Sequence, residues 1–174
     1  MEIRKAVMSD IDKIMDIYSS ARRFMAEQGN PTQWWEGYPP RELIVSDIEE
    51  GECRLVTEGD EILAVFYTAW GIDPTYVKIY DGEWGTDEPY GVLHRVAVSP
   101  DARGKGVAGF IFSRMLEKFG IIRIDTHENN IPMQKALEKA GFTRRGIIYI
   151  RNPEELTDAE REFCKRVAYD NALK

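Results

Sequence analysis

The sequence VAVSPDARGKGVAG, at residues 96–109, is the stretch that decides the fold. An apolar, β-rich run ends at a proline, and a loop of arginine, lysine and glycines then leads into an amphipathic helix. Such a loop directs several backbone N–H groups and a helix N-terminus at one place, where an anion binds, most often a phosphate. Gly104 and Gly106 let the backbone approach that ligand closely, and Arg103 and Lys105 add positive charge. The stretch therefore predicts a binding site for a phosphorylated cofactor.

Two interpretations fit this loop. Residues 104–109 match the pattern G-x-G-x-x-G, and Asp125 follows where a dinucleotide-binding unit keeps its acidic ribose ligand. A Rossmann turn, however, joins the strand directly to its first glycine, whereas residues 99–103, with a proline, intervene here. Rossmann units also usually open their domain, and the 65 residues after Gly109 are too few for a nicotinamide site. These features argue against a dinucleotide site, and a nucleotide-dependent oxidoreductase is kept only as a rival hypothesis.

A second motif favours the other interpretation. Asn130 begins a predicted helix that ends at Gly141-Phe142, and Gly141 suits the left-handed position after a helix. Together with the pattern Arg103-x-x-Gly106-x-Ala108, it resembles the GNAT superfamily of N-acetyltransferases. The resemblance covers residues 1 to about 151, and it implies the mixed α/β fold of that family with acetyl-CoA (CoA) as the cofactor.

The resemblance also implies a mechanism, in which acetyl-CoA and an amine bind together and the amine attacks the thioester directly. N–H groups of the central strand would donate to the developing oxyanion. The expected cofactor contacts are Val96, Val98, Arg103, Gly104, Lys105, Gly106, Val107, Ala108, Asn130 and Met133.

One residue departs from the family pattern. Many members carry a tyrosine seven residues after the asparagine, as general acid for the leaving thiolate, and this chain has Leu137 there. A thiolate with a pKa of about 8.5 leaves readily enough that an acid can be dispensable. The departure nevertheless keeps open a third hypothesis, a catalytically silent acyl-CoA-binding regulatory domain.

Two histidines are candidates for the base that deprotonates the amine. His94 lies two residues before Val96 on the predicted central strand, so strand alternation would place both on one face. An imidazole with a pKa of about 6.5 is a suitable proton acceptor at neutral pH. His127 is the second candidate. The alternatives are that His94 is a core histidine and that His127 bonds the helix start at Asn130.

Two irregular segments, residues 30–38 and 70–90, are rich in aromatic side chains, and the second is also acidic. Such a surface suits a cationic amine. In the ordinary alternative, aromatic rings cover the core, carboxylates face water and Asp125 pairs with Arg123 or Arg95. The candidate contacts to the acceptor are Trp34, Tyr80, Trp84, Asp125 and Thr126.

Composition bounds the remaining choices. The 174 residues suit one domain, and no apolar run reaches membrane-spanning length. The net charge of −7 argues against nucleic acid as a partner. The charge is uneven, because residues 91–151 carry 11 Lys/Arg against 5 Asp/Glu, which suits a polyanionic cofactor. Cys53 and Cys164 lie far apart and suggest reduced thiols in a cytoplasmic protein, and with two histidines no metal site is expected.

The predicted order of elements is β-α-α-β-β-β-α-β-α-β. This order fits a mixed α/β sheet flanked by helices, and the resemblance to the GNAT superfamily implies that this central sheet is mostly antiparallel. Residues 1–151 form the predicted acetyltransferase domain, and residues 152–174 a C-terminal helical extension of it. The capping box Thr157-x-x-Glu160 begins a helix expected over Asp158 to about residue 171. We expect that helix to dock on the body or on a second subunit, which would make a homodimer.

Overall fold

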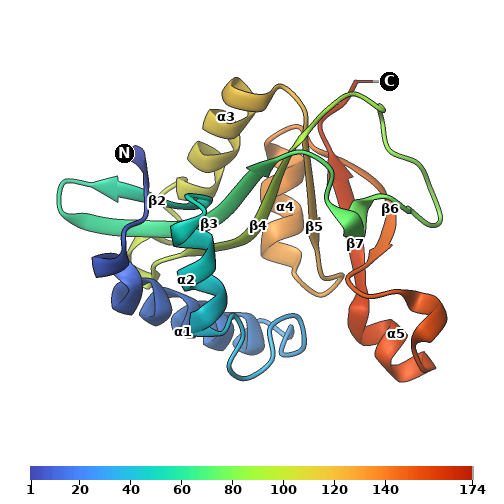
Figure 1. The fold of residues 1–174 in the computed structure, drawn as a ribbon, viewed down its shortest axis with the longest axis horizontal. Helices are drawn as coiled ribbons and strands as arrows, with labels where there is room; N and C mark the ends of the chain where they lie inside the picture. The colour runs from blue at the N-terminus through green and yellow to red at the C-terminus, as the bar shows by residue number, and fades with distance from the viewer. Residues whose placement is uncertain (174) are drawn as a thin grey trace. The chain divides into compact units, whose positions relative to one another are not determined.

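The computed structural model describes residues 1–173 and contains a sheet of seven strands flanked by helices (Figure 1). The strand order is β1-β2-β3-β4-β5-β7-β6, and the pairs β1–β2, β2–β3, β5–β7 and β6–β7 are antiparallel. The predicted mixed, mostly antiparallel fold is confirmed. The strands are β1 (Glu2–Lys5), β2 (Cys53–Glu58), β3 (Glu61–Trp70), β4 (Gly91–Val98), β5 (Ile122–Thr126), β6 (Thr143–Tyr149) and β7 (Lys165–Asp170).

The α-helices are α1 (Ile11–Glu27), α2 (Arg41–Glu49), α3 (Val107–Phe119), α4 (Ile131–Lys139) and α5 (Asp158–Cys164). The chain divides into two compact units. Unit 1 comprises Met1–Ala69 and Leu93–Ile111, and unit 2 comprises Trp70–Val92 and the residues from Phe112 onward. The chain passes from one unit to the other within β4 and within α3.

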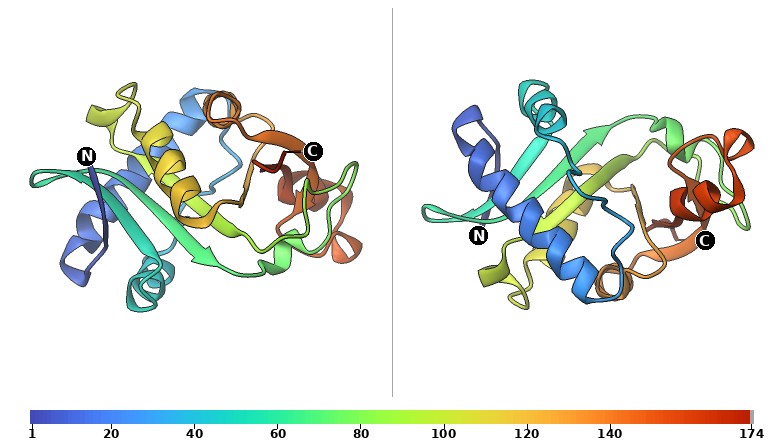
Figure 2. Two further views of the ribbon diagram at one scale, coloured as in Figure 1. Left: turned by 90° about the horizontal axis from the view of Figure 1, so that it is seen from above. Right: turned by 90° about the horizontal axis from the view of Figure 1, so that it is seen from below.

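The core of unit 1 forms between α1, α2 and the first strands. In α1, Ile11, Ile14 and Tyr18 recur at intervals of three or four residues, so they line one face of the helix. That face packs with Ile44 of α2 and Leu55 of β2, all of them buried. Figure 2 shows α1 running across β2 and β3. Ala97 of β4, the strand that leads into the glycine loop, is buried in the same core.

Unit 2 is organised around β7, which lies between β5 and β6. Tyr169 of β7 pairs with Ile124 of β5, and Val167 pairs with Ile147 of β6. Ile147 also bonds to Tyr80, because the two residues exchange backbone hydrogen bonds of 2.8 Å in an isolated bridge. The irregular segment 70–90 is thereby fastened to β6.

The prediction for the C-terminal segment is correct at its start and wrong at its end. Thr157 and Glu160 form the expected capping box, with the Glu160 carboxylate accepting the Thr157 N–H at 3.0 Å. The helix, however, ends at Cys164 and the chain continues directly as β7 (Figure 1). Residues 165–170 therefore do not extend the helix. Their backbone groups pair with two strands, and almost all of their side chains are buried.

Candidate cofactor loop and active-site residues

The glycine loop of unit 1 is held at both ends and open in its middle. The Ser99 N–H donates to the Leu63 carbonyl at 2.8 Å, and Ala102 and Val107 are 1% and 2% exposed. Between them, Gly104 and Gly106 have φ angles of +78° and +79°. A Cβ atom added at either glycine would meet no heavy atom within 4 Å. The loop therefore presents bare backbone to open space.

The start of α3 adds N–H donors to this loop. The Phe110 N–H donates to the Gly106 carbonyl at 3.0 Å, which is the first intrahelical bond. Within residues 1–173, the N–H groups of Gly106, Val107, Ala108 and Gly109 bond to no other group. The first N–H groups of a helix lack intrahelical partners and carry the positive end of the helix dipole. The predicted residues thus provide donors suited to a diphosphate.

The two basic side chains of the loop are placed differently. The Arg103 guanidinium lies 4.3 Å from the centre of the Phe24 ring and donates to the Ser20 carbonyl at 3.2 Å. Both residues belong to α1, in the same unit. Lys105 is exposed. Arg103 is therefore engaged by the protein itself, whereas the ammonium group of Lys105 faces water.

The backbone between the two strand candidates is not regular. Arg95, which separates His94 from Val96, has a φ of +51°, in the left-handed region that residues with a Cβ rarely adopt. A left-handed residue interrupts the alternation of a strand, as in bulges that redirect a side chain. The argument that His94 and Val96 share a face by alternation is therefore not valid. The His94 ring lies 5.8 Å from the Tyr67 ring.

Arg95 is clamped from two sides. Its guanidinium donates to the Asp47 carboxylate of α2 at 2.6 Å and lies 4.7 Å from the centre of the Tyr67 ring of β3. The two charged side chains are only 12% and 7% exposed. Burial raises the pKa of Asp47, although the positive charge of Arg95 acts in the opposite direction. No sequence signal links these residues, because they lie 48 positions apart.

Cys53 belongs to the core of unit 1 and has no sign of reactivity. Its side chain is 2% exposed, and burial raises the pKa of its thiol to about 12. A thiol with so high a pKa is not a nucleophile at neutral pH.

His127 of unit 2 organises the start of α4. Its Nδ1 accepts the Asn129 N–H at 3.1 Å, and its carbonyl accepts the Asn130 N–H at 2.9 Å. Burial, with the nearby Arg166, lowers the pKa of His127, so the ring is neutral at pH 7. A neutral imidazole that accepts at Nδ1 carries its proton on Nε2. In this arrangement neither ring nitrogen of His127 is available to accept a further proton.

The second motif has the local structure expected from its residues. The Asn130 side chain accepts the Met133 N–H at 3.3 Å and so caps the N-terminus of α4. At the other end, Gly141 has a φ of +89°, and the Phe142 N–H donates to the Leu137 carbonyl at 3.0 Å. This is the Schellman ending. Leu137 is fully buried, so it serves the core.

Two of the predicted acceptor contacts in unit 2 belong to one network. The Tyr76 hydroxyl donates to Asp125 at 2.7 Å, and the Trp84 indole N–H donates to the Tyr76 carbonyl at 2.9 Å. The Arg123 guanidinium lies 4.2 Å from the centre of the Trp84 ring. Asp125 thus bonds to Tyr76, and Arg123 stacks on aromatic rings. Fully buried Tyr76, whose pKa burial raises well above its ordinary value, is the centre of this network.

The other three predicted acceptor contacts, Trp34, Tyr80 and Thr126, each have other neighbours. Thr126 is 1% exposed, and its hydroxyl has no hydrogen-bond partner in residues 1–173. The Tyr80 ring packs edge-on against Tyr149 at 5.2 Å. Trp34 belongs to unit 1, where its ring lies 5.6 Å from that of Tyr18. Of the predicted acceptor contacts in unit 2, Trp84 and Asp125 are linked through Tyr76.

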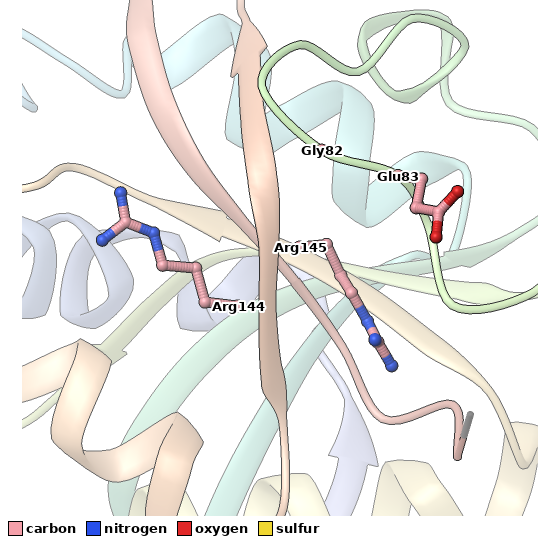
Figure 3. Close-up of a pocket in the computed structure, with 4 residues that line it drawn as sticks. All are labelled: Gly82, Glu83, Arg144 and Arg145. Carbon is pink, nitrogen blue, oxygen red and sulfur yellow. The ribbon is translucent and has the colours of Figure 1, made fainter.

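Unit 2 also contains two polar hollows beside β6. One, of about 470 Å³, is lined by Gly82, Glu83, Arg144 and Arg145. Figure 3 shows the two arginines extending to opposite sides of the strand. Arg145 bonds to the buried Asp170 at 2.7 Å. The second hollow, of about 400 Å³, adds Asp81, Glu128, Gly146, Ile147 and Lys165 to the two arginines.

Residues 1–173 contain neither a membrane-spanning helix nor a cluster of metal-ligating side chains. No helix there is long and apolar enough to cross a bilayer. The same residues contain no group of three or more His, Cys, Asp or Glu side chains that could hold a metal ion.

Comparison with known proteins decides the family. The model of the acetyltransferase (GNAT) family matches residues 11–142. The chain belongs to the GNAT family. This GNAT acetyltransferase therefore uses an acyl-CoA donor and an acceptor substrate, and the oxidoreductase interpretation of its loop is wrong. No match was found among curated protein sequences.

Solved structures agree with this assignment. A GNAT-family acetyltransferase from Streptococcus agalactiae is 32% identical to the chain, with a TM-score of 0.84, over 99% of this chain and 95% of that one. A Bacillus subtilis acetyltransferase solved in complex with CoA is 17% identical, with a TM-score of 0.62, over 99% of each chain. A ribosomal-protein-alanine N-acetyltransferase from Brucella melitensis is 14% identical, with a TM-score of 0.65, over 99% and 100%. At these lower identities the likeness concerns the fold of this GNAT protein alone.

Proposed function

We propose that the protein is an acetyl-CoA-dependent N-acetyltransferase that moves an acetyl group to a primary amine of a small molecule, amino acid or peptide. The observation that carries the proposal is the loop of unit 1, with left-handed Gly104 and Gly106 and free N–H groups at the start of α3. Because no side chain or neighbouring atom fills the space beside either glycine, the loop fits a diphosphate such as that of CoA.

Different residues of unit 1 hold the cofactor, stabilise the reacting thioester and accept the proton of the amine. When bound, acetyl-CoA supplies an acetyl thioester for transfer to the amine. The backbone of residues 104–108 holds the diphosphate, and Lys105 adds a charge. N–H groups of β4 near Val96 and Val98 donate to the thioester oxygen as negative charge develops there. His94 takes the proton of the ammonium, directly or through water, because an ammonium cannot act as a nucleophile.

The remaining assignments stay predictions. Asn130 and Met133 are predicted cofactor contacts in unit 2. His127 is a second candidate base, and the acceptor contacts predicted from the sequence are Trp34, Tyr80, Trp84, Asp125 and Thr126. A cytoplasmic location and a homodimer are likewise predictions.

Release of free CoA thiol tests the proposal. The purified protein is incubated with acetyl-CoA and a panel of primary amines, amino acids and short peptides, and the thiol is measured with a chromogenic disulfide. We expect thiol release that depends on an amine, with one class of amine preferred. Protection against thermal unfolding by acetyl-CoA without thiol release from any amine would instead support the silent regulatory domain, in which buried Leu137 replaces the general acid.

A further inference from the structure

Arg103 begins the glycine loop, but its side chain is directed to α1. The guanidinium lies over the Phe24 ring at 4.3 Å and donates to the Ser20 carbonyl at 3.2 Å. Arginine suits such a place, because its planar group can stack on a ring while its edge donates hydrogen bonds. A contact between this guanidinium and a phosphate would compete with both interactions.

The loop benefits from such an anchor. Gly104 and Gly106 adopt the left-handed conformations of the loop. Glycine also has more conformational freedom than any other residue when the loop is disordered, so ordering these two residues costs the most entropy. Buried Ala102 and Val107 hold the two ends. With Arg103 fixed to α1 as well, only residues 104–106 remain to be ordered when an anion binds. A loop that is ordered in advance binds more tightly, because less entropy is lost.

We propose that Arg103 is a positioning residue, which fixes the loop to α1 through Phe24 and Ser20 and does not itself contact the cofactor phosphates. Lys105 is then the side chain of the loop that supplies charge to them. This inference rests on the proposed binding of acetyl-CoA at the loop, and it predicts that Arg103 influences that binding only through its contact with α1.

The substitution Phe24→Leu separates the two possible roles of Arg103 by the sign of its effect. If Arg103 positions the loop, loss of the ring should weaken acetyl-CoA binding roughly threefold, the scale of one cation–π contact. The same substitution should have no effect in an Arg103→Ala background, where the contact is already absent. If Arg103 bound the phosphates directly, Phe24→Leu would release it, and affinity would stay equal or rise. Phe163→Leu, in α5 of unit 2, is the matched control.

Two further measurements complete the test. The dissociation constants are measured by calorimetry at several salt concentrations. Lys105→Ala should reduce the salt dependence of binding more than Arg103→Ala does, because the screened attraction is strongest for the charge nearest the phosphates. Amide hydrogen exchange in the cofactor-free protein should rise at Lys105, whose N–H donates to the Ala102 carbonyl at 3.3 Å, in both the Phe24→Leu and Arg103→Ala variants.

The outcomes distinguish the two proposals. Failure of the unaltered protein to bind acetyl-CoA would overturn the proposed function. Normal binding by that protein, with equal or higher affinity in Phe24→Leu, would overturn the positioning role alone. Unchanged hydrogen exchange in both variants would overturn it as well, whatever the affinity for acetyl-CoA.

Discussion

Substitution of Gly106 should separate backbone strain from cofactor binding. Its φ is +79°, and a Cβ there would meet no heavy atom within 4 Å, so alanine adds strain without a clash. The left-handed conformation costs a residue with a Cβ about 1–2 kcal/mol, which for a chain of this length lowers Tm by roughly 2–8 °C. Gly106→Glu adds a carboxylate beside the proposed diphosphate. Two unit charges about 4 Å apart near a protein surface repel by ~4 kcal/mol, close to a thousandfold in Kd.

Gly29 provides a matched control within the same unit. Its φ is +83°, and it too has no heavy atom within 4 Å of an added Cβ, but it follows the C-terminus of α1. Gly29→Ala and Gly29→Glu should therefore lose about the same stability as the Gly106 variants and bind acetyl-CoA normally. Thermal unfolding gives the first quantity and calorimetry gives the second. Equal Kd values for Gly106→Glu and Gly29→Glu would refute the assignment of the loop.

Three other changes test the base, the buried ion pair and a surface ion pair. His94→Ala should lower kcat/KM by roughly 10²–10⁴ and remove the acidic limb of the pH–rate profile, with acetyl-CoA affinity nearly unchanged; full activity with an unchanged profile would place the base elsewhere. Asp47→Asn should lower the free energy of unfolding, measured in urea, by about 3 kcal/mol, because it leaves the Arg95 charge buried and unpaired. A decrease below about 1 kcal/mol would contradict this prediction. The hydrogen bond from Arg4 lowers the pKa of Asp10 in the folded protein. The ionised Asp10 carboxylate therefore stabilises the fold at pH values above its ordinary pKa, and this stabilisation is lost as the pH falls through the lowered pKa of the folded protein. Asp10→Asn should thus be less stable than the unaltered protein at pH 7, and the difference should narrow below about pH 4 in urea unfolding; a constant difference would count against the bond.

Local signals in the sequence predicted local structure well. The glycine loop, the cap at Asn130 and the left-handed Gly141 follow from residue types whose backbone preferences act over a few positions. The overall sheet followed from the order of the strands and helices and from the resemblance to the GNAT family. These features need no knowledge of distant contacts.

Features that depend on distant contacts were not predicted. The capping box at Thr157 marks where α5 begins, but neither glycine nor proline marks where it ends, so the change from helix to strand after Cys164 has no local signal. It arises because β7 pairs on both sides. The left-handed conformation of Arg95 is equally invisible, since arginine has no preference for it, and tertiary contacts to Asp47 and Tyr67 accompany it.

The place of β7 in the sheet has a consequence for the chain as it leaves the ribosome. Every residue of unit 1 has been synthesised once Ile111 has been added. Unit 2 is completed later, and β5 and β6 are synthesised before β7, the strand that lies between them, so β6 has no ladder partner until residues 165–170 follow. After Tyr149 has been added and before residues 165–170 follow, the nascent chain carries an unpaired strand edge at Ile148, the kind of surface that aggregates or recruits chaperones.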